Sequence, residues 1–292
     1  MDPSTNSAFN PSAAPAAATP TLTPISDTSA AKRPRNAKGF FRGGGYIGII
    51  LPILIIGLWH ESANRGWVDA VFLPPPLEVV KESWLMLTEQ DLLHDFWISI
   101  SIVGQAFVYG SVLAISLGLV AGLSRKVELF FAPTLNTLRH IPSVAWLPLI
   151  VLWLGLGAPA KILVLAKSVF FPVFLNTLQA IRHVDKNYIE LSRVLTLSRW
   201  KMVKRVILPA VLPSIAVSLR YSAGLAWALV VVAEGLSGLE GLGFLIFRAQ
   251  GLLLTKQLLV CMIAIGMVGF VIDRGLYLLQ RRVTRWKVAF EG

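Results

Sequence analysis

The chain has 292 residues, of which 55% are hydrophobic and 15% charged, and its formal net charge at neutral pH is +11. The apolar excess excludes an ordinary soluble domain and indicates a membrane protein. The positive charge does not indicate nucleic-acid binding, because the basic residues lie in loops that flank apolar runs and form no groove-reading helix. The single cysteine, Cys261, excludes a disulfide framework within one chain.

The N-terminal segment, residues 1–42, is rich in Ala, Pro, Ser and Thr and ends in a basic cluster. Its lack of hydrophobic periodicity predicts a disordered tail. Because Lys and Arg concentrate on the cytoplasmic side of spans, the cluster predicts a cytoplasmic tail and a first span over residues 46–59. Residues 43–292 are then predicted to form one membrane domain.

A polar segment, residues 60–95, follows the first span and is expected to lie outside the membrane. Three consecutive prolines at positions 74–76 predict an extended stretch, and the pattern after them predicts a surface helix over residues 77–87.

Five more apolar runs follow. Small residues repeat every four positions along the first of them, which favours close approach of another helix; they are Ala106, Gly110, Ala114, Gly118 and Gly122. The predicted second to sixth spans are residues 96–123, 141–156, 160–181, 206–234 and 258–279. Four glycines between positions 235 and 243 predict a flexible outer loop. Basic clusters at the inner ends predict an all-α bundle of about six spans with both termini in the cytoplasm.

One cation interrupts the fourth predicted span. An amine such as that of Lys167 costs about 2.5–3.5 kcal/mol at the centre of a membrane helix unless it faces water or a partner. Lys167 could therefore line a translocation pathway and favour anions, or it could pair with Glu234 or a backbone carbonyl. Lys167, Glu234 and Trp227 are the candidate pathway residues. Trp146 and Trp153 are open to the same role, although tryptophans near span ends also anchor helices at the interface.

The segment between the fourth and fifth spans, residues 185–206, is charged and amphipathic and predicts two short helices at the cytoplasmic face. Ser198 is positioned as the N-cap of the second helix. The basic residues of the segment are Lys186, Arg193, Arg199, Lys201, Lys204 and Arg205.

This loop resembles the cytoplasmic signature of the permease subunits of bacterial ATP-binding-cassette importers, written E-A-A, three residues, G, nine residues, I-x-L-P. Glu190 and the VILP end stand at the matching spacing. Thr196 stands where the signature has Gly, and a β-branched residue is a poor substitute in a left-handed turn. The residues that the resemblance assigns to the ATPase-coupling loop are Glu190, Leu191, Ser192, Thr196, Leu197, Val206, Leu208 and Pro209.

The resemblance extends from about residue 73 to residue 286, through phrases such as FLPPPLEVV, IPSVAWLPLIVLWLGLG and GLAWALVVVAEGL. It is greatest to the permeases of aliphatic sulfonate, nitrate, taurine and bicarbonate importers. It implies a subunit of the bacterial cytoplasmic (inner) membrane that forms the path for a small anion. The implied partners are a second permease copy, two copies of a cytoplasmic ATPase and an external solute-binding protein.

No catalytic, cofactor or metal site is predicted. His60 and Glu61 begin like the HExxH zinc motif, but position 64 is Asn. The sequence contains no GxxxxGK[ST] phosphate loop, so any ATP hydrolysis is expected on a separate subunit. The remaining alternative is a self-contained secondary transporter or channel, which would call for internal repeats or broken helices around a site, and no convincing duplicated segment is found.

Overall fold

The computed structural model describes residues 47–90 and 92–285, and every regular element within them is helical. The chain divides into two compact units, of which the first ends at Pro52 and the second begins at Ile53. The boundary lies inside α1 (Ile47–Asn64), which covers most of the predicted first span. The predicted disordered tail lies outside the described residues.

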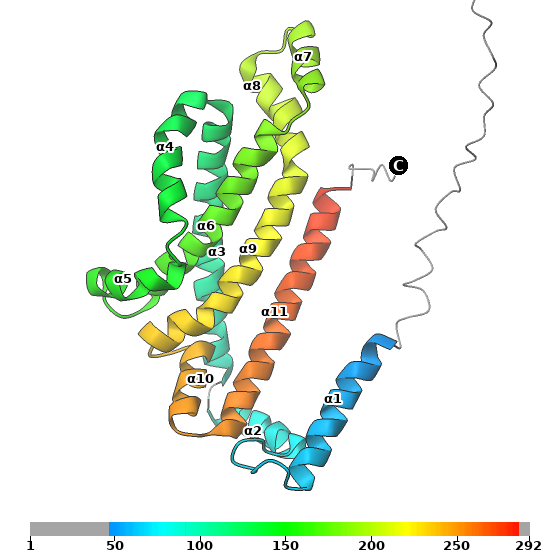
Figure 1. Cartoon of the computed structure of the whole chain (residues 1–292), viewed down its shortest axis with the longest axis vertical. Coiled ribbons are helices and arrows are strands. Elements are labelled where there is room, and N and C mark those ends of the chain that lie inside the picture. The colour runs from blue at the N-terminus through cyan, green and yellow to red at the C-terminus, as the bar shows by residue number, and fades with distance from the viewer. Residues whose placement is uncertain (1–46, 91, 286–292) are drawn as a thin grey trace, which may run out of the picture. The chain divides into compact units, whose positions relative to one another are not determined.

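Four helices in the described part of the chain are long and apolar enough to cross a membrane, and all lie in the second unit (Figure 1). They include α3 (Leu92–Leu123), α6 (Ala158–Arg182) and α11 (Thr255–Val283). The fourth is a continuous helical segment from Arg199 to Ser237, most of which is α9 (Leu208–Ser237). Each contains one of the predicted spans, so these four predictions are confirmed.

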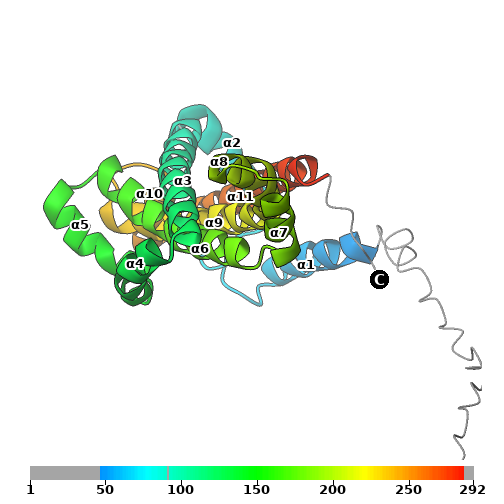
Figure 2. The same cartoon turned by 90° about the horizontal axis from the view of Figure 1, so that it is seen from above.

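The core of the second unit is built on α3, α6 and α9. The small-residue stripe of α3 lies directly against α6: a methyl group added to Gly110 would lie 2.6 Å from the carbonyl oxygen of Ala166. One added to Gly118 would lie 2.9 Å from the side chain of Thr177. The predicted close approach is thus confirmed, because the two backbones leave no room for larger side chains there. Figure 2 shows these three helices packed together.

The predicted third span, residues 141–156, is wrong as a straight membrane helix. The chain instead forms α4 (Arg125–Leu138), a 3₁₀ turn η2 (Ser143–Trp146) and the short helix α5 (Leu147–Leu154), and the two halves are bent by 87°. Pro142 precedes η2, so the residue before it is disfavoured in a helix. The eight residues of α5 rise only about 12 Å, well short of a bilayer core of about 30 Å. Counting the bent pair as one broken span, the described residues hold up to five spans.

The opposite end of the second unit from the predicted cytoplasmic loop carries two short helices, α2 (Pro76–Glu89) and α10 (Leu242–Gly251) (Figure 1). The surface helix predicted at 77–87 is therefore confirmed. The glycine-rich loop predicted at 235–243 is shorter than expected, because α9 runs to Ser237 and α10 begins at Leu242. The cytoplasmic-loop prediction corresponds to α7 (Lys186–Val194), α8 (Arg199–Met202) and the π-helical turn η3 (Val203–Ile207).

Candidate functional site

A cavity of about 450 Å³ lies beside the middle of α6 and is bounded by α3, α4, η2 and α5. Among the described residues, Lys167 is the only charged one in its lining. The rest of the lining is apolar, mostly leucines and large aromatic rings. The aromatic residues are Tyr109, Trp146, Trp153, Phe170 and Phe171.

The ammonium group of Lys167 is held at the edge of this cavity. Its Nζ donates a hydrogen bond of 2.8 Å to the carbonyl oxygen of Ile141. It also lies 5.6 Å from the ring centroid of Trp146 and 5.2 Å from that of Phe171, within the range of a cation–π interaction. The Ile141 carbonyl is free to accept because the helix is broken between α4 and η2. Of the two structural partners considered from the sequence, the backbone carbonyl is present and Glu234 is not.

Glu234 lies instead near the C-terminal end of α9, in a network that caps α10. Its Oε2 accepts a 2.8 Å bond from the N–H of Gly243 and a 2.9 Å bond from the hydroxyl of Ser99. The Ser99 oxygen in turn accepts from the N–H of Leu242, at 3.0 Å, and Asp95 accepts from that of Gly241, at 2.6 Å. Three successive N–H groups at the start of α10, which a helix leaves unpaired, are therefore satisfied by side chains from α3 and α9. We call this network of Asp95, Ser99 and Glu234 the outer clamp, and this end of the unit the outer end, because the sequence predicts that it faces away from the cytoplasm.

Lys161, to which the sequence analysis gave no role, lies beside the outer clamp. It is 3% exposed, and its Nζ donates to the carbonyl oxygen of Glu240 at 3.2 Å. Glu234 itself is fully buried, and within the described residues its Oε1 has no hydrogen-bond partner. The sequence did contain a signal for this role, because Lys161 stands about one turn into an apolar run. A charge buried there is rarely left without a partner.

Trp227 lies in the contact between α9 and α11. It is 5% exposed, and its indole N–H donates to the carbonyl oxygen of Ile265 at 3.0 Å. Gly269 of α11 lies against the ring, and a methyl group there would be 3.0 Å from it. In this structure Trp227 is thus a helix-packing residue away from the Lys167 cavity, whereas Trp146 and Trp153 line that cavity.

The predicted coupling loop forms two short helices joined by a tight turn. Thr196 has a φ of 49°, so it occupies the left-handed conformation expected of the signature glycine. The N–H of Leu197 bonds to the carbonyl oxygen of Ser192 at 3.0 Å, which closes the turn. Ser198 caps α8 as predicted, since its hydroxyl accepts from the N–H of Lys201 at 3.4 Å.

The surface of this loop is apolar as well as charged. Glu190 is exposed, and Leu191, Val194 and Leu195 are all more than half exposed. By contrast Ser192, in place of the second alanine of the signature, is buried and donates to the carbonyl oxygen of Tyr188. The partly buried residues Leu197, Val206, Leu208 and Pro209 complete the set assigned to the loop. Exposed leucines beside charges are typical of a surface that another protein covers.

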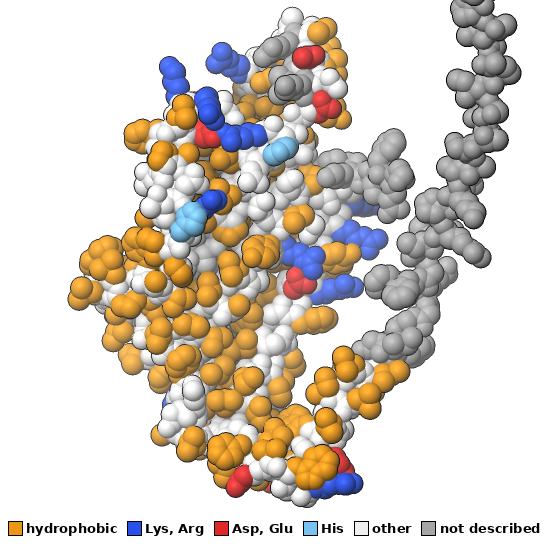
Figure 3. Space-filling model, viewed as in Figure 1, with side chains coloured by type: hydrophobic (Ala, Val, Ile, Leu, Met, Phe, Trp, Pro, Cys, Tyr) orange, Lys and Arg blue, Asp and Glu red, His pale blue; other side chains and the backbone are white. Residues whose placement is uncertain are grey.

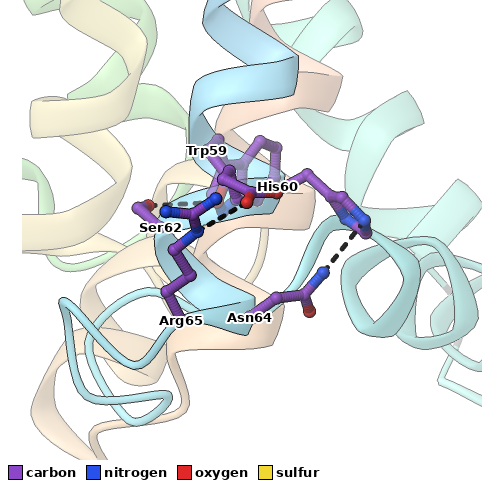
Figure 4. A network of polar contacts seen from close by, with 6 residues as sticks. Trp59, His60, Ser62, Asn64 and Arg65 are labelled. Carbon is purple, nitrogen blue, oxygen red and sulfur yellow. Dashed lines mark hydrogen bonds and ion pairs between the residues drawn. The ribbon is translucent and has the colours of Figure 1, made fainter.

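No catalytic or metal site emerges in the described part of the chain. Within residues 47–90 and 92–285, no three His, Cys, Asp or Glu side chains are grouped to hold a metal ion. The HExxH-like start at His60 forms only local contacts: His60 lies 3.0 Å from the amide of Asn64, and Glu61 pairs with Arg65 at 2.6 Å (Figure 4). Trp59 donates to the carbonyl oxygen of Pro74 at 3.0 Å and thereby ties α1 to the proline stretch.

Several apolar helices of membrane length, joined by a polar helical loop at one end, define a multi-span membrane protein. Comparison with known families gives the particular assignment: residues 110–285 match the binding-protein-dependent transport system inner membrane component, and the chain belongs to this family.

Relatives of the chain are named as permeases for several different solutes. The chain is 35% identical over 258 residues, 88% of this chain and 94% of the relative, to a protein of Bacillus subtilis named as an aliphatic sulfonates transport permease, SsuC. It is 31% identical to the taurine transport permease TauC of Escherichia coli, over 80% of this chain and 86% of that one. It is 32% identical to the bicarbonate transport permease CmpB of Synechococcus elongatus, over 82% and 90%.

Solved structures share the fold at lower identity. The chain matches a methionine ABC transporter, MetNI, solved in inward-facing conformations, with a TM-score of 0.60 and 17% identity over 66% of this chain and 96% of the other. It also matches a bacterial alginate ABC transporter, solved in complex with a periplasmic protein, with a TM-score of 0.58 and 18% identity over 82% and 94%. The expectation of an importer-permease fold is confirmed.

Proposed function

We propose that this chain forms the translocation pathway of an ATP-driven importer for a small organic anion, and that the anion is an aliphatic sulfonate. The observation that carries the proposal is the position of Lys167 on the wall of the aromatic cavity. A cation inside a membrane helix is costly unless it has a function or a partner. Its one hydrogen bond within the described residues, to Ile141, leaves two of the three ammonium hydrogens available to a solute.

The character of the cavity favours a solute with one anionic head and an apolar tail. A sulfonate could accept hydrogen bonds from the Lys167 ammonium, while its alkyl chain lay against leucines and rings such as Phe170. Nitrate and bicarbonate have no tail to bury in such a lining. Taurine carries an ammonium group, and the described lining includes no carboxylate to pair with it.

Energy would come from a separate ATPase, with one copy docked on the α7–α8 loop of each of two permease chains. The exposed leucines around Glu190 supply an apolar contact, and the basic residues near α8 supply charge. A solute-binding protein would deliver the anion at the opposite end, near α2 and α10. In this proposal the chain lies in a bacterial inner membrane with both termini in the cytoplasm, and the basic ends of its predicted spans support that orientation.

Lys167→Met tests the pathway. Met preserves much of the length and packing of Lys without the charge. The variant is reconstituted with its ATPase and binding protein, and uptake of a labelled alkyl sulfonate is measured beside thermal stability. We expect uptake to fall at least about tenfold, which corresponds to one lost interaction of about 1.4 kcal/mol. Lys126→Met, which alters an exposed lysine at the start of α4 outside the cavity lining, is the matched control and is expected to transport normally.

Unimpaired uptake by a stable Lys167→Met protein would remove Lys167 from the pathway and leave it the structural role of bonding Ile141. A loss of thermal stability with normal uptake per folded molecule would lead to the same conclusion. Uptake of nitrate or bicarbonate in preference to sulfonates by the unaltered importer would contradict the proposed solute.

A further inference from the structure

A second set of charged groups lies within two of the helices long enough to cross a membrane, α9 and α11, and outside the lining of the Lys167 cavity. Arg220 of α9 makes a bidentate ion pair with Asp273 of α11, with N–O distances of 2.6 and 2.8 Å. Both side chains remain accessible, at 34% and 53%. Asp273 is ten residues before the end of α11 at Val283, about 15 Å along the helix axis. The pair therefore lies well inside the end of the helix and faces outward.

Two arginines at this position are held in place by one ring. The guanidinium carbon of Arg220 lies 5.0 Å from the ring centroid of Tyr277, and that of Arg274 lies 5.4 Å from it. Within the described part of the chain, Arg274 has no hydrogen-bond or ion-pair partner. Two arginines against one aspartate leave a net positive charge that is preorganised by stacking on Tyr277.

A small polar hollow lies in the same groove, toward the ends of the helices. It has a volume of about 240 Å³ and is lined by Ser214, Gln280 and Thr284 together with Pro213 and Val217. The Oε1 atom of Gln280 is buried and has no donor among the described residues. The hollow therefore presents neutral hydrogen-bonding groups, and Arg220 lies three residues beyond Val217 on α9.

The exposed face of α11 changes character at this level. Met267 and Val271 are 61% and 66% exposed, and Arg274 and Arg281 continue the same face at helical spacing. Figure 3 shows hydrophobic side chains over the middle of the molecule and Lys and Arg side chains along the part of α11 that leads to its C-terminal end. An apolar stripe that becomes basic within two turns is typical of the boundary between acyl chains and headgroups.

We propose that the groove between the inner ends of α9 and α11 binds the headgroup of an anionic phospholipid from the cytoplasmic leaflet. The phosphate pairs with Arg274 and the free edge of Arg220, hydroxyls of the headgroup reach Ser214 and Gln280, and the acyl chains follow Met267 and Val271. Basic pockets between membrane helices on the cytoplasmic side suit such headgroups. This inference rests on the proposed orientation, with α7 and α8 in the cytoplasm, and does not depend on the transported solute.

Lipid binding by the purified full-length chain tests the proposal without any transport measurement. Protein is placed in phosphatidylcholine with increasing phosphatidylglycerol, and both thermal midpoint and lipid retained in native mass spectrometry are recorded. We expect phosphatidylglycerol to raise the midpoint. For Arg274→Gln, the phosphatidylglycerol content that gives half of the increase in thermal midpoint should be about five- to tenfold higher. The reason is that one arginine near a lipid surface contributes about one kcal/mol. Gln280→Leu should weaken retention in the same direction.

Arg248→Gln, at an exposed arginine of α10 near the other end of the molecule, is the matched control and should behave as the unaltered chain. If the Arg274→Gln and Gln280→Leu variants both respond to phosphatidylglycerol as the unaltered chain does, the assignment is overturned. If inorganic phosphate or glycerol phosphate in detergent raises the thermal midpoint as much as phosphatidylglycerol does, the hollow binds a soluble anion instead. Dissociation of a dimer by Arg274→Gln in lipid-free detergent would show that a second chain covers the groove, which also overturns it.

Discussion

The two ends of the membrane unit are stabilised in opposite ways. At the outer end, Asp95, Ser99 and Glu234 join α3, α9 and α10 through hydrogen bonds between residues more than 130 positions apart. At the other end, α7 and α8 are held by short-range bonds, with exposed leucines and a left-handed Thr196. The outer end is closed by buried side chains of the chain itself, whereas the other end presents apolar surface that little of the chain covers.

This difference indicates that the outer end is stabilised by contacts within the chain, whereas the α7–α8 end is left to be stabilised by a partner. Buried polar groups that hydrogen-bond across several helices favour one arrangement and are costly to disturb. A loop with few buried contacts opens at low free energy and can adapt to a partner. Substitutions at the outer clamp should therefore lower stability, whereas substitutions of exposed side chains in the α7–α8 loop should act mainly on transport.

The largest effect is expected from Glu234→Ala. It removes the acceptor of the Gly243 N–H and leaves a cavity, which together should destabilise the protein by about 3 kcal/mol. The matched change Glu190→Ala, at an exposed glutamate, should stay within about 0.5 kcal/mol. Thermal unfolding of both variants in detergent measures the difference, and Ser99→Ala serves if Glu234→Ala does not accumulate. Equal midpoints for the two glutamate variants would contradict the contrast between the ends.

Gly241→Ala should be the next most damaging. Gly241 has a φ of 108°, and a methyl group there would lie 2.5 Å from the carboxyl carbon of Glu234. Backbone strain of this kind costs about 1–3 kcal/mol. Gly251→Ala is the control, because nothing lies within 4 Å of its added methyl group. The same thermal assay should show a lowered midpoint for Gly241→Ala and an unchanged one for Gly251→Ala. An unchanged midpoint for Gly241→Ala would mean that the outer clamp can shift to accommodate the methyl group.

Thr196→Gly should stabilise the opposite end. Relief of about 1–2 kcal/mol of left-handed strain outweighs a glycine entropy cost of about 0.5–1 kcal/mol. A net gain of up to about 1 kcal/mol should raise the midpoint by roughly 2–4 °C. Thr196→Val keeps the β-branch and should give no gain. A lower midpoint for the glycine variant would show that the Thr196 side chain makes a contact that compensates for its backbone.

The smallest effect on stability, and a large one on transport, is expected from Glu190→Lys. Its carboxylate is exposed, so folding should change by no more than about 0.5 kcal/mol. The added cation joins an already basic surface, and we expect ATP hydrolysis to become uncoupled from uptake. ATPase activity and uptake are measured on the same reconstituted sample. Normal uptake by a normally expressed variant would remove Glu190 from the coupling role.

Local patterns made much of the fold predictable from the sequence. The repeat of small residues along α3, the apolar runs of α6, α9 and α11, and the Ser198 cap each appear within one segment of sequence. The break before α5 was missed because residues 141–156 form an apolar run, and the proline at 142 was outweighed by that hydrophobicity. Hydropathy records how apolar a run is and contains little about where it bends.

The candidate sites were predictable only in part. Lys167 was identified because a single charge stands out in an apolar span. The outer clamp was not foreseen, because Asp95, Ser99 and Glu234 come together only through packing of α3 against α9 and α10. Contacts over such sequence distances leave no periodic signal in a single sequence.

The unbroken helical segment from Arg199 to Ser237 has a mechanical consequence. Its 39 residues span about 58 Å, from the Ser198 cap to within a residue of Gly238. A rod of that length amplifies rotation: a tilt of about 10° pivoted at one end moves the other by roughly 10 Å. The π-helical turn at Val203–Ile207 lies near the α8 end of the rod and Pro213 lies within α9, and both interrupt the regular α-helical hydrogen bonds. A push delivered to α8 would therefore arrive at the far side of the membrane as a sideways displacement of Glu234 and the residues it holds.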